Sequence, residues 1–175
     1  MYSTNFGPVI QNAFTVRDMD AALAYWIDVM GVGPFFCTDK ATYREALYRN
    51  APASPQYAVA LAYWGDTQIE LIAPTSNNPN IYNEFLDDGL DGLLHHMCVT
   101  VEDIGEFRRG LDKQKFEILS ELAMEPAGHV LYLRGKGQKW PLIEIGEFPP
   151  VIYEVFERVK SASEDWDGRD PIRQF

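Results

Sequence analysis

The chain has 175 residues, of which 46% are hydrophobic, and its 26 acidic and 15 basic side chains give a formal net charge of −11. This composition is too apolar for intrinsic disorder, and the acidic balance argues against binding to nucleic acid or to an anionic membrane surface. With two cysteines, no signal-peptide pattern and no run of 18 apolar residues, the sequence predicts a cytoplasmic protein.

The first part of the chain predicts a strand, a helix and then further strands. The predicted strands are 8–16, 35–39, 56–64 and 67–73, and the helix lies between the first two. Asp18 is placed to cap the start of this helix, which ends near Gly31. Gly65-Asp66 between the last two strands is typical of a tight hairpin turn, whereas segment 40–55 has no clear pattern.

The second part of the chain repeats this order. Its predicted strands are 93–101, 116–121, 129–134 and 142–146. Asp103 precedes a predicted helix, with Glu106 at the capping-box spacing. A short helix is predicted at 81–86, in the polar segment between the two parts, and a last helix follows Pro149-Pro150.

The repeat is also visible in the residues themselves. Gln11–Asp18 aligns with His96–Asp103 at an offset of 85 residues (96 − 11), with matching Thr, Val and Asp residues. Glu70 and Glu144 lie in similar apolar triplets at an offset of 74 residues (144 − 70). The smaller second offset indicates extra residues in the first copy, and segment 40–55 is the simplest place for them.

The sequence therefore predicts an α+β fold in which two βαβββ modules form a curved, cup-shaped mixed sheet with helices outside. The expected divisions are a first module at 1–75, a linker with a short helix at 76–92, a second module at 93–147, and a C-terminal helix and tail at 148–175.

Four polar residues occupy equivalent places in the two copies. Alternation along a strand directs Gln11, Glu70, His96 and Glu144 away from the helices, and it directs His95 to the opposite face from His96. A buried carboxylate with apolar neighbours is costly unless it is compensated, either by a distant arginine or lysine or by a cation. Three oxygen ligands and one imidazole suit one divalent ion of Zn, Ni, Co, Mn or Fe.

These segments resemble the vicinal oxygen chelate superfamily, which contains glyoxalase I, methylmalonyl-CoA epimerase, extradiol dioxygenases and bleomycin-resistance proteins. The segments that carry the resemblance are Val9–Asp18, Gly31–Phe35, Gln68–Ile72, Gly92–Met97 and Pro141–Ile145. The glyoxalase I and methylmalonyl-CoA epimerase branches are the most similar. The family places its metal ligands at the positions of Gln11, Glu70, His96 and Glu144.

The resemblance implies a metal-dependent lyase, isomerase or epimerase that removes a proton next to a carbonyl and stabilises an enediolate. It implies Glu144 or Glu70 as the base, and we prefer Glu144, with Glu70 on the opposite face of the substrate carbon. The first alternative is a non-catalytic binding protein that sequesters a small molecule, although such a protein needs no buried carboxylates. A ring-cleaving non-haem iron dioxygenase is less favoured, because Gln11 stands where a second histidine is expected.

The sequence offers four candidates for contact with substrate. They are Arg44, Arg49, Trp64 and His129. Solvated loop positions for the two arginines and a structural role for His129 are the competing interpretations. The expected partner is a small molecule, apolar or aromatic in character, and a homodimer is expected. Whether the site forms within one chain or between two exchanged modules is left open by the sequence.

Overall fold

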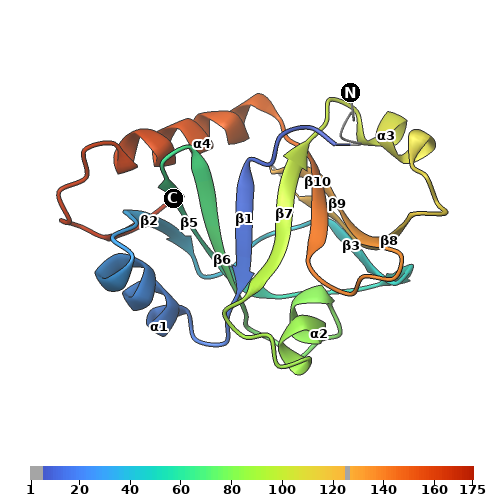
Figure 1. Cartoon of the computed structure of the whole chain (residues 1–175), viewed down its shortest axis with the longest axis horizontal. Helices are drawn as coiled ribbons and strands as arrows, with labels where there is room; N and C mark the ends of the chain where they lie inside the picture. The colour runs from blue at the N-terminus through green and yellow to red at the C-terminus, as the bar shows by residue number, and fades with distance from the viewer. Residues whose placement is uncertain (1–5, 125–126) are drawn as a thin grey trace.

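The computed structural model describes residues 6–124 and 127–175, whose strands form one curved, unclosed mixed sheet (Figure 1). The strands are β1 (Gln11–Thr15), β2 (Phe35–Thr38), β3 (Glu45–Tyr48), β4 (Ala51–Pro52), β5 (Tyr57–Trp64), β6 (Thr67–Pro74), β7 (Leu94–Thr100), β8 (Phe116–Met124), β9 (Gly128–Gly135), β10 (Leu142–Glu147) and β11 (Ile172–Gln174). The helices are α1 (Met19–Ala24), which continues as a π-helical turn (Tyr25–Val29), α2 (Ile81–Asp87), α3 (Ile104–Gly110) and α4 (Pro150–Ser163). The predicted α+β fold class is confirmed.

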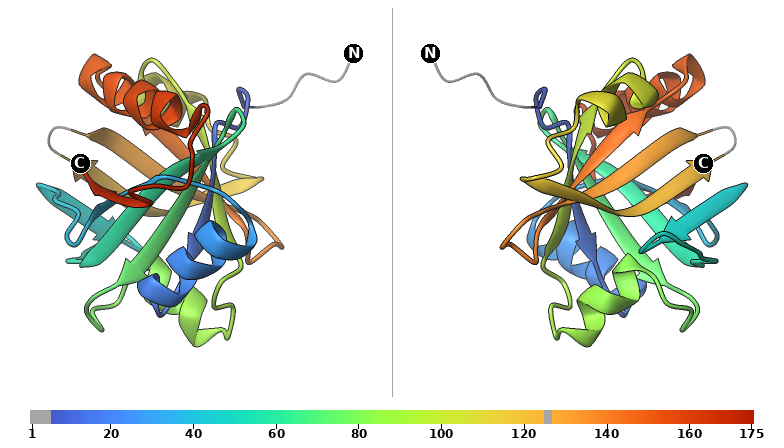
Figure 2. Two further views of the ribbon diagram at one scale, coloured as in Figure 1. Left: turned by 90° about the vertical axis from the view of Figure 1, so that its left-hand side faces the viewer. Right: turned by 90° about the vertical axis from the view of Figure 1, so that its right-hand side faces the viewer.

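The two copies of the repeat lie side by side in the sheet. The strand order is β11-β2-β5-β6-β1-β7-β10-β9-β8-β3-β4. In the first copy β1 pairs in parallel with β6, and in the second β7 pairs in parallel with β10. An antiparallel pairing of β1 with β7 joins the copies, and the side views show how the joined strands curve (Figure 2). One chain therefore forms the whole cup.

The helices cover both faces of the sheet. On α1, Leu23 packs with Phe35 and Ala60 on the outer face, and on α3, Ile104 packs with Val99 of the second copy. In contrast, α4 packs on the inner face, where Val159 joins Phe36 and Leu61. The module helices α1 and α3 thus lie outside the cup as expected, and the C-terminal helix α4, for which the sequence predicted no side, covers the inner face. In the described part of the chain, none of the helices has the length and apolar character needed to span a bilayer.

Both predicted aspartate caps are present. Asp18 Oδ1 accepts a hydrogen bond from the backbone N–H of Ala21 (2.9 Å), and Asp103 Oδ1 accepts one from the N–H of Glu106 (2.7 Å). Each bond satisfies a donor that the first helical turn leaves without a partner. The short polar side chains therefore fix where α1 and α3 begin.

The segment without a clear sequence pattern becomes part of the second half of the sheet. Residues 45–52 form the β3–β4 hairpin, and β3 pairs antiparallel with β8. Pro52 lies in the outermost strand, which is the position in a sheet where proline is tolerated. Strands this short have too few residues to show alternation, which is why the sequence did not predict them.

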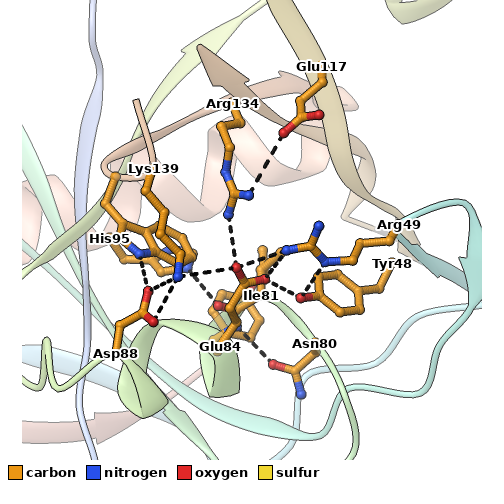
Figure 3. Close-up of polar contacts among 12 residues, drawn as sticks. Tyr48, Arg49, Asn80, Ile81, Glu84, Asp88, His95, Glu117, Arg134 and Lys139 are labelled. Atoms are coloured by element: carbon orange, nitrogen blue, oxygen red, sulfur yellow. Dashed lines mark hydrogen bonds and ion pairs between the residues drawn. The ribbon is translucent and has the colours of Figure 1, made fainter. Parts of the chain in front are cut away.

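Polar contacts tie α2 to the second half of the sheet. Glu84 of α2 contacts Arg49 (2.9 Å) after β3, Arg134 (3.2 Å) of β9 and the hydroxyl of Tyr48 (Figure 3). Lys139 also lies near Glu84 (3.9 Å) and pairs more closely with Asp88 (2.6 Å). We call Glu84 and its partners Tyr48, Arg49, Arg134 and Lys139 the α2 clamp.

Candidate active site

A cavity of about 380 Å³ lies on the inner face of the cup. Gln11 of β1, Glu70 of β6 and Glu144 of β10 line it, so both copies of the repeat contribute. The apolar neighbours of each glutamate pack on the outer face, as alternation requires. Three of the four predicted ligand positions therefore open into one cavity.

His96 lies between the two carboxylates. Its Nε2 atom is 3.1 Å from Oε2 of Glu144 and 3.5 Å from Oε2 of Glu70. The ring is fully buried, and Nε2 has no partner with hydrogen-bond geometry among the described residues. The imidazole therefore does not line the cavity itself, but its Nε2 lies next to the two carboxylates that do.

Opposite charges set the ionisation of this group. Burial alone would lower the pKa of His96, but the nearby Glu144 and Glu70 carboxylates raise this pKa to about 9. Burial also acts to raise the pKa of Glu144, but His96 outweighs it and the pKa falls below the usual range. For Glu70 burial is the larger effect, and its pKa is raised. The two carboxyl groups are therefore shifted in opposite directions.

The amide of Gln11 is oriented by a second buried glutamine. Gln11 Nε2 donates to Oε1 of Gln68 (2.6 Å), and Gln68 Nε2 donates to the hydroxyl of Tyr63 (3.3 Å). Gln11 Oε1 is buried and has no partner among the described residues. The sequence reasoning missed Gln68, although its position two residues before Glu70 places both side chains on the same strand face.

His95 does not follow the strand alternation that the sequence predicted for it. The register of β7 against β1 passes from His96 opposite Ala13 to Leu94 opposite Phe14, so His95 is the extra residue of a β-bulge. Its Nδ1 lies 2.8 Å from Nδ1 of His96. Its Nε2 lies 3.4 Å from the carbonyl oxygen of Ile81, and Figure 3 shows this contact.

The bulge gives His96 a hydrogen-bond partner on the ring nitrogen that faces away from the carboxylates. Burial and the neighbouring His96 lower the pKa of His95 well below its usual value, so His95 is neutral. Its Nδ1 therefore accepts a hydrogen bond from the Nδ1–H of His96. This bond fixes the orientation of the His96 ring and leaves Nε2 directed at the cavity side.

Three tyrosines, which the sequence reasoning did not single out, form another part of the cavity wall. They are Tyr57, Tyr82 and Tyr132, and all are buried. The hydroxyls of Tyr82 and Tyr132 lie 2.9 Å apart, and Tyr132 is directly opposite Glu144 in the β9–β10 pairing. Burial raises the pKa of all three phenols, which keeps them neutral. They offer hydroxyl groups beside the carboxylates.

The donor atoms fit a divalent ion in type, although they are not assembled around one. Within residues 6–124 and 127–175, no three His, Cys, Asp or Glu side chains stand in a ready metal-binding arrangement. Two buried atoms without partners, Gln11 Oε1 and His96 Nε2, nevertheless belong to the predicted ligand set. Ligands at about 2.1 Å from a shared ion lie roughly 3–3.4 Å apart, close to the His96–carboxylate distances.

The predicted substrate-contacting residues do not line this cavity. Arg49 belongs to the α2 clamp, and Trp64 is 56% exposed and packs near Trp26. His129 Nε2 lies 2.7 Å from Oε1 of Glu121. Arg44 and His129 line a neighbouring surface hollow instead. The structure therefore brings the predicted ligands together but not the predicted substrate contacts.

Comparisons with known proteins agree with this architecture. The model of the "Glyoxalase/Bleomycin resistance protein/Dioxygenase superfamily" matches residues 10–132. Mitochondrial methylmalonyl-CoA epimerase of Homo sapiens is 27% identical over 119 residues, which are 67% of this chain and 59% of the human protein. The Mus musculus epimerase is 26% identical over 137 residues, 76% of this chain and 68% of that protein.

Two solved structures share the fold. Methylmalonyl-CoA epimerase from Mycobacterium tuberculosis superposes with a TM-score of 0.54 at 18% identity, covering 88% of this chain and 96% of that one. A hypothetical protein from Bacillus halodurans C-125 gives a TM-score of 0.58 at 15% identity, covering 79% of this chain and 92% of that one.

The matched part of the chain spans about three fifths of the human and bovine epimerases, at 59% and 61% of their lengths.

Proposed function

The chain belongs to the glyoxalase/bleomycin resistance protein/dioxygenase superfamily, and on that premise we propose that it is a metal-dependent isomerase or epimerase. The proposed reaction begins with removal of a proton from the carbon next to a carbonyl group. The names of the human and mouse relatives support the isomerase class within the superfamily. The fold alone would not support the isomerase class, because proteins with one such scaffold catalyse several different reactions.

One observation carries the proposal. Glu70 and Glu144 come from different halves of the chain, and both meet the buried His96 at the wall of one cavity. One buried and one largely buried carboxylate beside a single imidazole are an expensive arrangement for a purely structural role. The nearby Gln11 Oε1, buried and without a partner among the described residues, adds a further unsatisfied oxygen.

In the proposed site, Gln11, Glu70, His96 and Glu144 hold one divalent ion. When bound, such an ion supplies positive charge that lowers the cost of removing a proton next to a carbonyl. Glu144 as a carboxylate accepts the proton, and Glu70, on the strand from the other half, in its protonated form returns a proton to the opposite face of the same carbon. His95 and Gln68 act as positioning residues, because they hold the His96 ring and the Gln11 amide.

Metal analysis of the purified chain tests the proposal. The wild-type protein is incubated with Zn²⁺, Ni²⁺, Co²⁺ or Mn²⁺, desalted, and measured by elemental mass spectrometry. We expect about one ion per chain, and we expect Glu144→Gln to weaken the affinity by more than about tenfold. Glu102→Gln, the same change at an exposed glutamate, is the matched control and should retain the metal. A wild-type chain without metal, or an unchanged Glu144→Gln, would contradict the proposal.

A second candidate function is non-catalytic capture of a small apolar molecule. The cavity favours it in one respect, because much of its wall comes from side chains such as Leu61, Ile152 and Phe156. This candidate requires neither a metal nor Glu144. It would be supported by a metal-free protein that binds an aromatic compound equally well with and without the Glu144→Gln change.

A further inference from the structure

The C-terminal segment closes one side of the cavity. Figure 1 shows α4 crossing from the β10 side of the sheet toward β2, and Ile152, Val155 and Phe156 of this helix line the cavity. The tail then returns as β11, which pairs in parallel with β2 and brings Phe175 to the same wall. These residues lie beyond the segment 10–132 that the superfamily model matches.

Apolar side chains face this segment across the cavity. Val59 and Leu61 of β5 and Met124 of β8 line the cavity with α4. Gln11, Glu70 and Glu144 line the cavity from the central strands β1, β6 and β10, and Thr38 and Lys40 add polar groups at the end of β2. The site thus offers polar groups for the reacting oxygens and apolar side chains on α4 and β5 for the rest of the substrate.

The lining of the cavity is poor in basic residues, and the nearby Arg158 and Arg173 lie over the ring of Phe36. Of its described lining residues, Lys40 alone is basic, and the exposed Asp39 precedes it. Arg49 and Arg134 are held in the α2 clamp. A coenzyme A thioester carries several phosphate charges, and a chain with a net charge of −11 offers them little compensation.

We propose that the substrate is a small uncharged carbonyl compound with a vicinal oxygen, whose aromatic or branched apolar group lies against α4 and Phe175. This inference rests on the proposed function and specifies its substrate class. It also separates this chain from its relatives that are named for a coenzyme A thioester. The apolar wall supplied by the C-terminal segment is the feature that selects the substrate.

Two probes differ only in the group that would face α4. 2-Hydroxyacetophenone and hydroxyacetone share a carbonyl with a neighbouring hydroxyl, but the first carries a phenyl group and the second a methyl group. We expect the metal-loaded protein to bind the phenyl compound at least about tenfold more tightly by calorimetry, because the ring is buried against apolar side chains. Methylmalonyl-CoA should not compete with it.

Variants on α4 connect this preference to the proposed wall. Val155→Trp fills the part of the cavity next to α4 and should weaken binding of 2-hydroxyacetophenone about tenfold without loss of metal. Glu154→Trp adds the same side chain at an exposed position of the same helix and should change neither property. Phe175→Ala, at a residue that is 45% exposed, should weaken binding of the phenyl probe several-fold and leave the fold intact.

The outcomes separate this inference from the proposed function. The proposed substrate class would be overturned by equal affinity for the two probes, by displacement with methylmalonyl-CoA, or by unchanged binding in either Val155→Trp or Phe175→Ala. None of these results would contradict the metal site. Failure of the protein to bind metal would overturn the proposed function by its own test. Proton exchange at the carbon bearing the hydroxyl, followed by NMR in D₂O, reports on the chemistry separately from affinity.

Discussion

Gln11 shows how a single side chain is prepared for a ligand by its neighbour. An amide can present either its oxygen or its nitrogen, and the hydrogen bond from Gln11 Nε2 to Gln68 settles that choice. The oxygen is left buried and without a described partner. His95 does the same for the His96 ring through the bond between their Nδ1 atoms. Neither Gln68 nor His95 is itself a ligand of the ion in the proposed site.

Replacing Gln68 by leucine should therefore weaken the site without removing a ligand. In Gln68→Leu the amide of Gln11 loses its fixed orientation, and we expect metal affinity to fall about tenfold. The free energy of unfolding should fall by only about 1 kcal/mol, the usual value of one such hydrogen bond. Metal titration and urea denaturation measure the two quantities. Gln56→Leu, at an exposed glutamine, is the control, and equal metal affinity in both variants would contradict the assigned role.

At the scale of elements, α2 holds together parts that are distant in the chain. Its Glu84 carboxylate contacts Arg49 and Tyr48 from the inserted hairpin region and Arg134 from β9. Burial would raise the pKa of Glu84, but hydrogen bonds from Tyr48, Arg49 and Arg134 outweigh it and lower this pKa. The helix also supplies the Ile81 carbonyl to His95. The α2 clamp thus supports the wall behind the candidate site.

The lowered pKa of Glu84 makes the stabilising effect of the α2 clamp depend on pH. A carboxyl whose pKa is lower in the folded state stabilises the fold above its unfolded pKa, and this effect is lost as the pH falls through the folded pKa. At pH 7, Glu84→Gln should lower the free energy of unfolding by about 1–3 kcal/mol. At acidic pH below the folded pKa, the difference between variant and wild type should shrink toward zero.

Urea denaturation at neutral and at acidic pH measures this difference. Glu117→Gln is the matched control, because Glu117 lies 3.8 Å from Arg134 but is 52% exposed and should contribute little. A difference between wild type and Glu84→Gln that is independent of pH would show that the carboxylate charge is not the source of the stability.

At the scale of the whole molecule, the candidate site belongs to one chain. Gln11 and Glu70 come from the first copy of the repeat and His96 and Glu144 from the second, and β1 pairs with β7 between them. The sequence left open whether the copies exchange between two chains. In this structure the curvature of a single sheet brings all four residues together.

Mixing two defective variants tests this single-chain arrangement. Glu70→Gln and Glu144→Gln each remove one proposed ligand, from different copies of the repeat. If each site forms within one chain, unfolding and refolding the two variants together should restore no tight metal binding. If modules were exchanged between chains, some sites in the mixture would contain both intact glutamates. Recovery of tight binding to a substantial fraction of the sites would contradict the single-chain site.

Local sequence patterns predicted the repeated strands and helices and the faces of the central strands, but not the short strands β3, β4 and β11. The aspartate caps, the Gly65 turn and the internal repeat depend on local chemistry, which a few neighbouring residues specify. Alternation placed Glu70 and Glu144 on the inner face for the same reason. It failed at His95, because a bulge depends on how β7 meets β1 and not on β7 alone.

The remaining side chains around the cavity depend on long-range packing. Gln68, the three buried tyrosines and the inner face of α4 reach it through strand pairing and helix packing between distant segments. Arg49, by contrast, pairs with Glu84 and does not line the cavity, although its position in the sequence did not predict that partner. Contacts across the sheet join residues many positions apart, so their identity depends on the curvature and register of the whole fold.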